Sequence, residues 1–166
     1  METLLWLEAT ALSIWLRESG PAFFGSLTLH ALGMAFLVGS HVATDLRTLG
    51  VAPGVPLSLM RRFRPVAWLA MVVVTASGVS LLLAYPTKAL TNPVFYVKLL
   101  AVALAIVFGR VLATSLLRSP DSDAQPSPPR AKLLAGLSLL LWAGAITSGR
   151  LLAYTYRVLM AADVSP

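Results

Sequence analysis

The sequence predicts an all-α integral membrane protein: a four-helix bundle with an N-terminal interfacial helix. The first observation is composition, because hydrophobic residues make up 57% of the 166 residues and charged residues only 12%. Typical soluble domains have about 25% charged residues. The second observation is that four apolar segments reach the length of about 20 residues that a bilayer crossing requires. Lipid offers no partner to an open backbone, so these segments are expected to be helices.

Residues 1–20 are expected to form an amphipathic helix that lies in the membrane interface. This stretch is shorter than the four apolar segments and carries charge, with Glu2 and Glu8 among its first residues. Trp6 and Trp15 would anchor it at the headgroup level. The acids and the lack of a basic start argue against a signal peptide.

Residues 21–166 are expected to form the four-helix domain. Its spans are predicted at about 21–44, 65–84, 93–117 and 133–153. Pro21, Pro65 and Pro93 stand at the predicted starts of three spans, and the first turn of a helix tolerates proline.

The loops predict the orientation of the chain. Basic residues gather in the loops after the first and third spans: Arg47, Arg61, Arg62 and Arg64, then Arg118, Arg130 and Lys132. The loop between the second and third spans holds Lys88 alone. The positive-inside rule therefore puts the first two loops in the cytoplasm and both termini outside. The net charge of +6 is explained by these loops, so no nucleic-acid partner is expected.

Small and polar residues form a stripe on each span, which is typical of helix contacts in membranes. We expect these stripes to face the bundle or a partner subunit. The residues are Ser26, His30, Gly33, Leu37, Ser40, His41 and Thr44 in the first span; Thr75, Ser77, Gly78 and Ser80 in the second; Lys98, Ala101, Ala105, Gly109 and Leu112 in the third; and Ser138, Trp142, Ala145 and Gly149 in the fourth.

Ionisable residues predict two polar layers at membrane depth, where charges are costly and usually functional. The outer layer would hold His30, Lys98 and Arg150, with Glu18 as a counter-charge. The inner layer would hold His41, Asp45, Arg47 and Arg110. His41 and Asp45 are four residues apart, so the carboxylate could orient the imidazole.

The two histidines are the candidate cofactor ligands. His30 could bind haem iron or copper or relay protons, or it could be a buried histidine bonded to a neighbouring helix. Met34 follows one turn later, and a His/Met pair suits Cu(I), although a methionine in an apolar helix usually serves packing. His41 could be a second ligand, or it could simply pair with Asp45.

Catalytic motifs are missing from the sequence. It has no P-loop and no Gly-x-Ser-x-Gly elbow, and Asp45 is the only acid in or bordering a span. The lack of cysteine excludes disulfides and thiolate metal sites. A hydrolase or a kinase is therefore not expected.

Several motifs carry a resemblance over nearly the whole chain. In order they are LRES, LHALGMAFLVGS, DLRTLG, RRFRPVAWLAMVVVTASGV, NPVFYVKLL and SLLLWAGAITSGR. The sequence resembles a bacterial family of small multi-pass membrane proteins of unknown function, which implies the inner (cytoplasmic) membrane. The family's motif positions correspond to His30, Asp45, Arg47, Lys98 and Arg150. His41 does not match that pattern.

The layout is more remotely similar to the copper-resistance D family and to four-helix b-type cytochromes. The shared features are a histidine in a Gly-containing helix, an Arg-Phe pair opening the next and a lysine early in the third. This likeness implies copper transport or b-type haem binding. Di-haem cytochromes use four histidines on two or more helices, whereas both histidines here are on one helix. A homodimer with a two-fold axis would bring each histidine to its copy.

Two functions remain open. In one, the protein is a haem- or copper-linked redox or transport component. In the other, it is a non-catalytic structural or assembly subunit of a larger membrane complex, and its small-residue stripes bind a partner helix. In both, the lipid bilayer is the surrounding partner.

Overall fold

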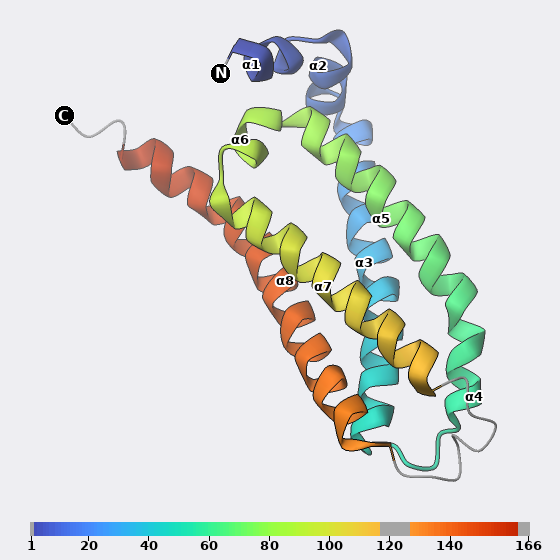
Figure 1. Cartoon of the computed structure of the whole chain (residues 1–166). Helices are drawn as coiled ribbons and strands as arrows, with labels where there is room; N and C mark the ends of the chain where they lie inside the picture. Colours follow the sequence, from blue (N-terminus) through green and yellow to red (C-terminus); the bar gives the residue numbers. More distant parts are fainter. Residues whose placement is uncertain (1, 117–126, 163–166) are drawn as a thin grey trace.

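A computed structural model of the chain describes residues 2–116 and 127–162, and its regular elements there are all helices. The four longest are α3 (Gly20–Leu49), α5 (Arg64–Ala84), α7 (Pro93–Leu116) and α8 (Pro129–Ala162) (Figure 1). Each contains a segment long and apolar enough to cross a membrane. The predicted all-α, four-span fold is confirmed. Residue 117, the predicted end of the third span, and Arg118 lie outside the described residues.

The first long helix continues beyond its predicted end at residue 44. It stops at Gly50, whose φ of 90° is left-handed and costs glycine little. The amide of Gly50 donates to the carbonyl of Arg47 (3.1 Å), and the amide of Val51 donates to that of Leu46 (3.1 Å). These bonds close the helix end in the way a glycine cap usually does.

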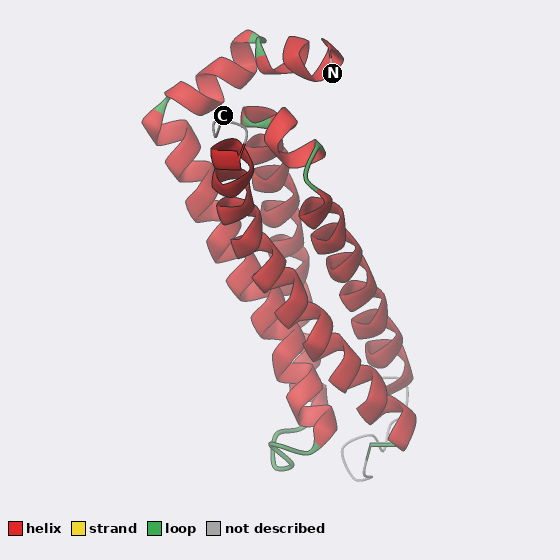
Figure 2. Ribbon diagram, turned by 90° about the vertical axis from the view of Figure 1, so that its left-hand side faces the viewer, coloured by secondary structure: helices red, strands yellow, loops and turns green. Residues whose placement is uncertain are grey.

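The N-terminal segment forms two short helices instead of the single helix expected. They are α1 (Glu2–Glu8) and α2 (Ala11–Glu18). Thr10 breaks the segment because its extended backbone lets its hydroxyl accept the amide of Ser13 (3.3 Å). Both helices lie across one end of the bundle, beside the short α6 (Pro86–Leu90) (Figures 1 and 2). The short α4 (Leu57–Met60) and the 3-10 helix η1 (Arg61–Phe63) lie at the opposite end.

The four long helices pack as two pairs. The most extensive contacts join α7 to α8 and α3 to α5, and contact between α3 and α8 holds the pairs together. Direct packing between α5 and α7 is minimal. The bundle is therefore open along one side, between these two helices.

The predicted small-residue stripes of α7 and α8 face the bundle, as do Gly33 and Leu37 of α3 and Ser77 of α5, whereas Thr75 of α5 is exposed. Ala101, Ala105 and Leu112 of α7 are buried, as are Ser138, Trp142 and Ala145 of α8, so these stripes are covered within the chain. Gly33 lies against Val73 and Val74, which lets α3 approach α5 closely. Large side chains such as Phe36 (60% exposed) and Leu140 (70% exposed) point outward, as expected of a lipid-facing surface.

Candidate functional site

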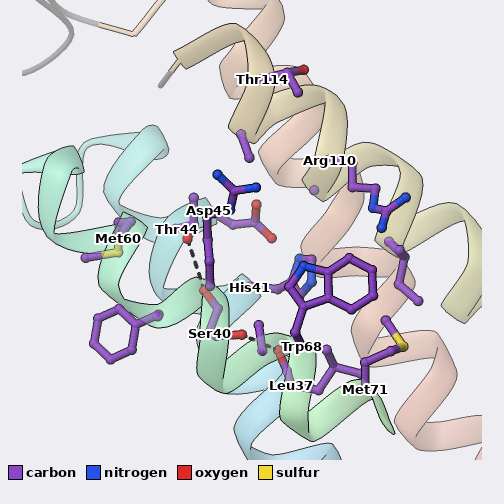
Figure 3. A pocket seen from close by; sticks show the side chains of 16 residues that line it. Leu37, Ser40, His41, Thr44, Asp45, Met60, Trp68, Met71, Arg110 and Thr114 are labelled. Carbon is purple, nitrogen blue, oxygen red and sulfur yellow. Dashed lines mark hydrogen bonds between the residues drawn. The ribbon is translucent and has the colours of Figure 1, made fainter. Parts of the chain in front are cut away.

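A cavity of about 820 Å³ lies between α3, α5 and α7, in the half of the bundle nearest α4. We call it the α5–α7 groove (Figure 3). Its apolar lining includes Leu37, Ile106 and Trp68, and the sulfur-bearing Met60 and Met71 also lie on it. Its polar lining comes from all three helices: Ser40, His41, Thr44, Asp45, Arg64, Arg110 and Thr114.

His41 of α3 reaches across to α7 and α8. Its imidazole lies against Gly109 of α7, in space that the Cβ of any other residue would occupy. The ring also lies 5.3 Å from the Trp142 ring, at an interplanar angle of 49°. Gly109 and Trp142 therefore fix the position of this histidine at the wall of the groove.

Asp45, one helical turn further along α3, is only 1% exposed. Neither carboxylate oxygen has a hydrogen-bond partner. The Ser138 hydroxyl lies beside the carboxylate, but its geometry falls short of a hydrogen bond. The hydrogen bond expected between Asp45 and His41 is absent, because the imidazole is turned toward Gly109 and Trp142.

The arginines of the predicted inner layer separate. The Arg110 guanidinium lies 5.2 Å from the ring centroid of Trp68, which joins α7 to α5 across the groove. The Nε of Arg47 instead donates to the carbonyl of Val55, in the connection after α3. The structure thus brings His41, Asp45 and Arg110 to one groove and directs Arg47 away from it.

His30 forms an interhelical hydrogen bond. Its Nδ1 lies 3.2 Å from the Val74 carbonyl and 3.1 Å from the Ser77 hydroxyl, both on α5. Ser77 itself donates to the Val73 carbonyl (2.6 Å). A carbonyl can only accept, so we assign the proton of the neutral imidazole to Nδ1. This geometry matches the alternative in which His30 is bonded to a neighbouring helix, although its side chain is half-buried.

The predicted outer layer is assembled only in part. Lys98 lies close enough to His30 for electrostatic interaction, and its Nζ is 3.8 Å from the Cβ position of Gly149. Arg150 and Glu18 are both exposed. Met34 packs against the apolar core of the bundle. Across the described residues, no three histidines or carboxylates gather in a group that could hold a metal ion.

Glu8 makes contacts between helices that the sequence did not predict. It lies 3.6 Å from Arg17 and accepts a hydrogen bond from Thr87 of α6 (2.5 Å). Arg17 also donates to the carbonyl of Ala84 (3.5 Å). Glu8 and Arg17 stand on different short helices, so only the break at Thr10 brings them together. These bonds tie α1 and α2 to the α5–α6 corner.

A family model described as a family of unknown function, DUF6644, matches residues 4–155. The match covers nearly all of the chain, so the chain belongs to that family, and the resemblance to a family of unknown function is confirmed. No curated protein and no solved structure matches the chain. The likeness to the copper-resistance D family and to cytochromes gains no support from these comparisons.

Proposed function

We propose that this member of the DUF6644 family binds one b-type haem in the α5–α7 groove, as a redox component of the membrane. One observation carries the proposal. A single groove gathers an imidazole, two thioethers and two guanidinium groups among apolar walls. That combination supplies the ligands of a haem iron and the partners of its two carboxylates.

The size and chemistry of the groove fit a porphyrin. Its volume of about 820 Å³ falls within the range of about 300–1,000 Å³ that is usual for cofactor sites. His41 would hold the haem iron through its imidazole, and Met71 or Met60 would supply a thioether ligand. Arg64 and Arg110 would bind the propionates, since planar guanidinium groups pair with carboxylates through two hydrogen bonds. A haem bound there would supply one-electron transfer.

The residues around the groove would hold such a ligand in place. Gly109 and Trp142 restrict the His41 ring, so its orientation is set before a ligand arrives. Arg110 would exchange its contact with the Trp68 ring for a carboxylate, which is a stronger partner. Apolar walls would limit access of water to the iron.

The geometry gives less support to the sites centred on His30. His30 does not line the groove, and its Nδ1–H bond to the Val74 carbonyl leaves only Nε2 to bind a metal. A two-fold dimer that shares iron between two His30 rings would have to bind it through Nε2, away from the thioethers and guanidinium groups of the groove. A copper site with Met34 would draw that side chain from the apolar core.

The alternative of an assembly subunit rested on small-residue stripes that bind a partner helix. The stripes of α7 and α8 are largely covered within the chain, with Ala105 and Ala145 both 0% exposed, whereas Thr75 of the α5 stripe is exposed. A partner of α7 or α8 would therefore have to bind their outer, large-residue faces. This burial favours the cofactor proposal over the assembly proposal.

We further propose the bacterial inner membrane as the location, with the groove near the cytoplasmic face. The basic residues at the α4 end of the bundle support this orientation. Arg62 and Arg64 are exposed there, close to the start of α5. Both termini would then lie on the outer side.

The test is an absorption spectrum of the detergent-purified protein, oxidised and dithionite-reduced, before and after hemin titration. We expect a reduced b-type α-band that His41→Ala removes. His30→Ala is the matched control, because His30 is on the same helix and lies outside the groove, and it should retain the band. Protein that binds no hemin, or that loses it only through His30→Ala, would overturn the proposal. Size-exclusion profiles establish that both variants are folded.

A further inference from the structure

Unpartnered polar atoms concentrate at one place in the bundle. Five buried side-chain polar atoms of the described residues lack a hydrogen-bond partner. Four of them belong to Asp45, Ser138 and Trp142, and the fifth to Ser13 in α2. Buried polar groups nearly always have partners, so such a concentration requires an explanation.

These three residues line the contact between α3 and α8. His41 lies against Trp142, and one turn away Asp45 lies beside Ser138. His41 and Asp45 also line the α5–α7 groove, whereas Ser138 and Trp142 do not. The groove is therefore the open space next to the buried carboxyl, whose two oxygens are covered in this structure (Figure 3).

None of the charged groups described around Asp45 forms an ion pair with its carboxylate. Its own helix contributes His41, while the guanidinium of Arg47 is bonded to Val55. Arg64 of α5 and Arg110 of α7 also line the groove, but neither lies within 4.0 Å of the carboxylate. Facing it from α8 is the neutral Ser138; the basic residues of α8 nearest this end, Arg130 and Lys132, are exposed.

An ionised carboxylate in this position would be costly. Burial of a charge without hydrogen bonds or a counter-ion is so unfavourable that such groups normally become neutral. A protonated carboxyl is both a donor and an acceptor, so a small rotation would let it bond to the Ser138 hydroxyl.

We propose that Asp45 is a proton-binding site that exchanges its proton with water through the α5–α7 groove. The carboxyl binds a proton in its buried position, and it releases that proton into the groove as the pH rises. This role needs no cofactor, so it goes beyond the proposed haem function and is tested on haem-free protein.

The experiment is labelling with a hydrophobic carbodiimide, dicyclohexylcarbodiimide, followed by peptide mass spectrometry. The reagent reacts with protonated carboxyls in apolar surroundings. The carboxyl proton passes to one carbodiimide nitrogen, the carboxylate oxygen bonds to the central carbon, and acyl transfer to nitrogen gives a stable N-acylurea without a leaving group. We expect the adduct on Asp45 at about pH 6, falling about tenfold per pH unit above the midpoint.

Two internal references and two variants make the labelling decisive. Glu8, which is paired with Arg17, and the exposed Glu18 should stay unlabelled at the same pH. Asp45→Asn should lose the adduct. Arg110→Gln should raise the pH midpoint, because the loss of a positive charge from the groove disfavours the carboxylate form.

The outcomes separate this proposal from the haem proposal. In haem-free His41→Ala protein the Asp45 adduct should persist even though hemin no longer binds. An Asp45 that stays unlabelled in folded wild-type protein from about pH 6 to about pH 9 would overturn the proton site. Labelling that does not change over this range would overturn it as well. Because the adduct is mapped on the wild-type chain, the test does not depend on Asp45→Asn folding.

Discussion

Gly33→Ala is expected to force α3 and α5 apart at their closest approach. A Cβ at this position would lie 2.8 Å from Cγ2 of Val74, 3.2 Å from Cγ1 of Val73 and 3.3 Å from the backbone nitrogen of Val74. Optimal contacts between carbon atoms are about 3.5–4.0 Å. A valine side chain can rotate away, but the backbone nitrogen cannot, so the helices must separate by a few tenths of an ångström.

The magnitude follows from two opposing effects. Extra volume in a packed interface costs about 1–3 kcal/mol. Replacement of glycine by alanine in a helix interior contributes about 1 kcal/mol in the opposite direction. The net effect of Gly33→Ala is thus a destabilisation of about 0–2 kcal/mol. The hydrogen bonds of His30, one turn earlier on α3, should lengthen at the same time.

Gly39→Ala is the matched control, because a Cβ at Gly39 of the same helix would meet nothing within 4 Å. Only the helix-propensity effect operates there, so Gly39→Ala should be neutral or stabilising by up to about 1 kcal/mol. The assay is reversible unfolding in mixed micelles, followed by circular dichroism. Equal stabilities of the two variants would refute the close approach of α3 and α5 at Gly33.

Three further changes test other parts of the molecule. His30→Ala should lower the free energy of unfolding by about 0.5–1.5 kcal/mol for each hydrogen bond lost to α5, measured in the same micelles; an unchanged stability would contradict the interhelical role. Arg110→Gln should weaken hemin binding about tenfold or more in a spectroscopic titration, since charge-assisted hydrogen bonds contribute about 1.5–3 kcal/mol, and unaltered affinity would exclude a carboxylate partner. Arg17→Ala should remove the pair with Glu8 and the bond to the Ala84 carbonyl, and so speed proteolysis within residues 2–18. Global stability should change by no more than about 1 kcal/mol, because the pair with Glu8 is partly exposed; unchanged cleavage would contradict this tether.

Hydropathy was sufficient to predict the four spans, because the length of an apolar segment and the thickness of a bilayer are directly related. The faces of the helices were also predictable, because small residues mark close helix contacts in membranes. The extension of α3 to Leu49 was not predicted. It depends on a glycine cap at Gly50, which hydropathy does not detect. The break at Thr10 was missed for a similar reason, since a single hydroxyl decides it.

The candidate site was predictable only in part. His41, Asp45 and Arg110 were expected at one depth, and they do line one groove. The predicted hydrogen bond between His41 and Asp45 was wrong. Spacing along one helix cannot show that Gly109 of α7 leaves room for the imidazole, which turns toward it. Met60, Met71 and Trp68 were not expected at the site. Their place depends on the separation of α5 from α7, which no local pattern encodes.

The pairing of helices also determines how the molecule is assembled during synthesis. N-terminal segments are made first, so α3 and α5 can pack together before α7 and α8 exist. At that stage His41 and Asp45 have no covering helix, because Trp142 and Ser138 are both on α8. Insertion of the last helix therefore removes the polar side chains of the first from lipid. A nascent chain that stops before α8 would leave the Asp45 carboxyl without the cover that α8 provides.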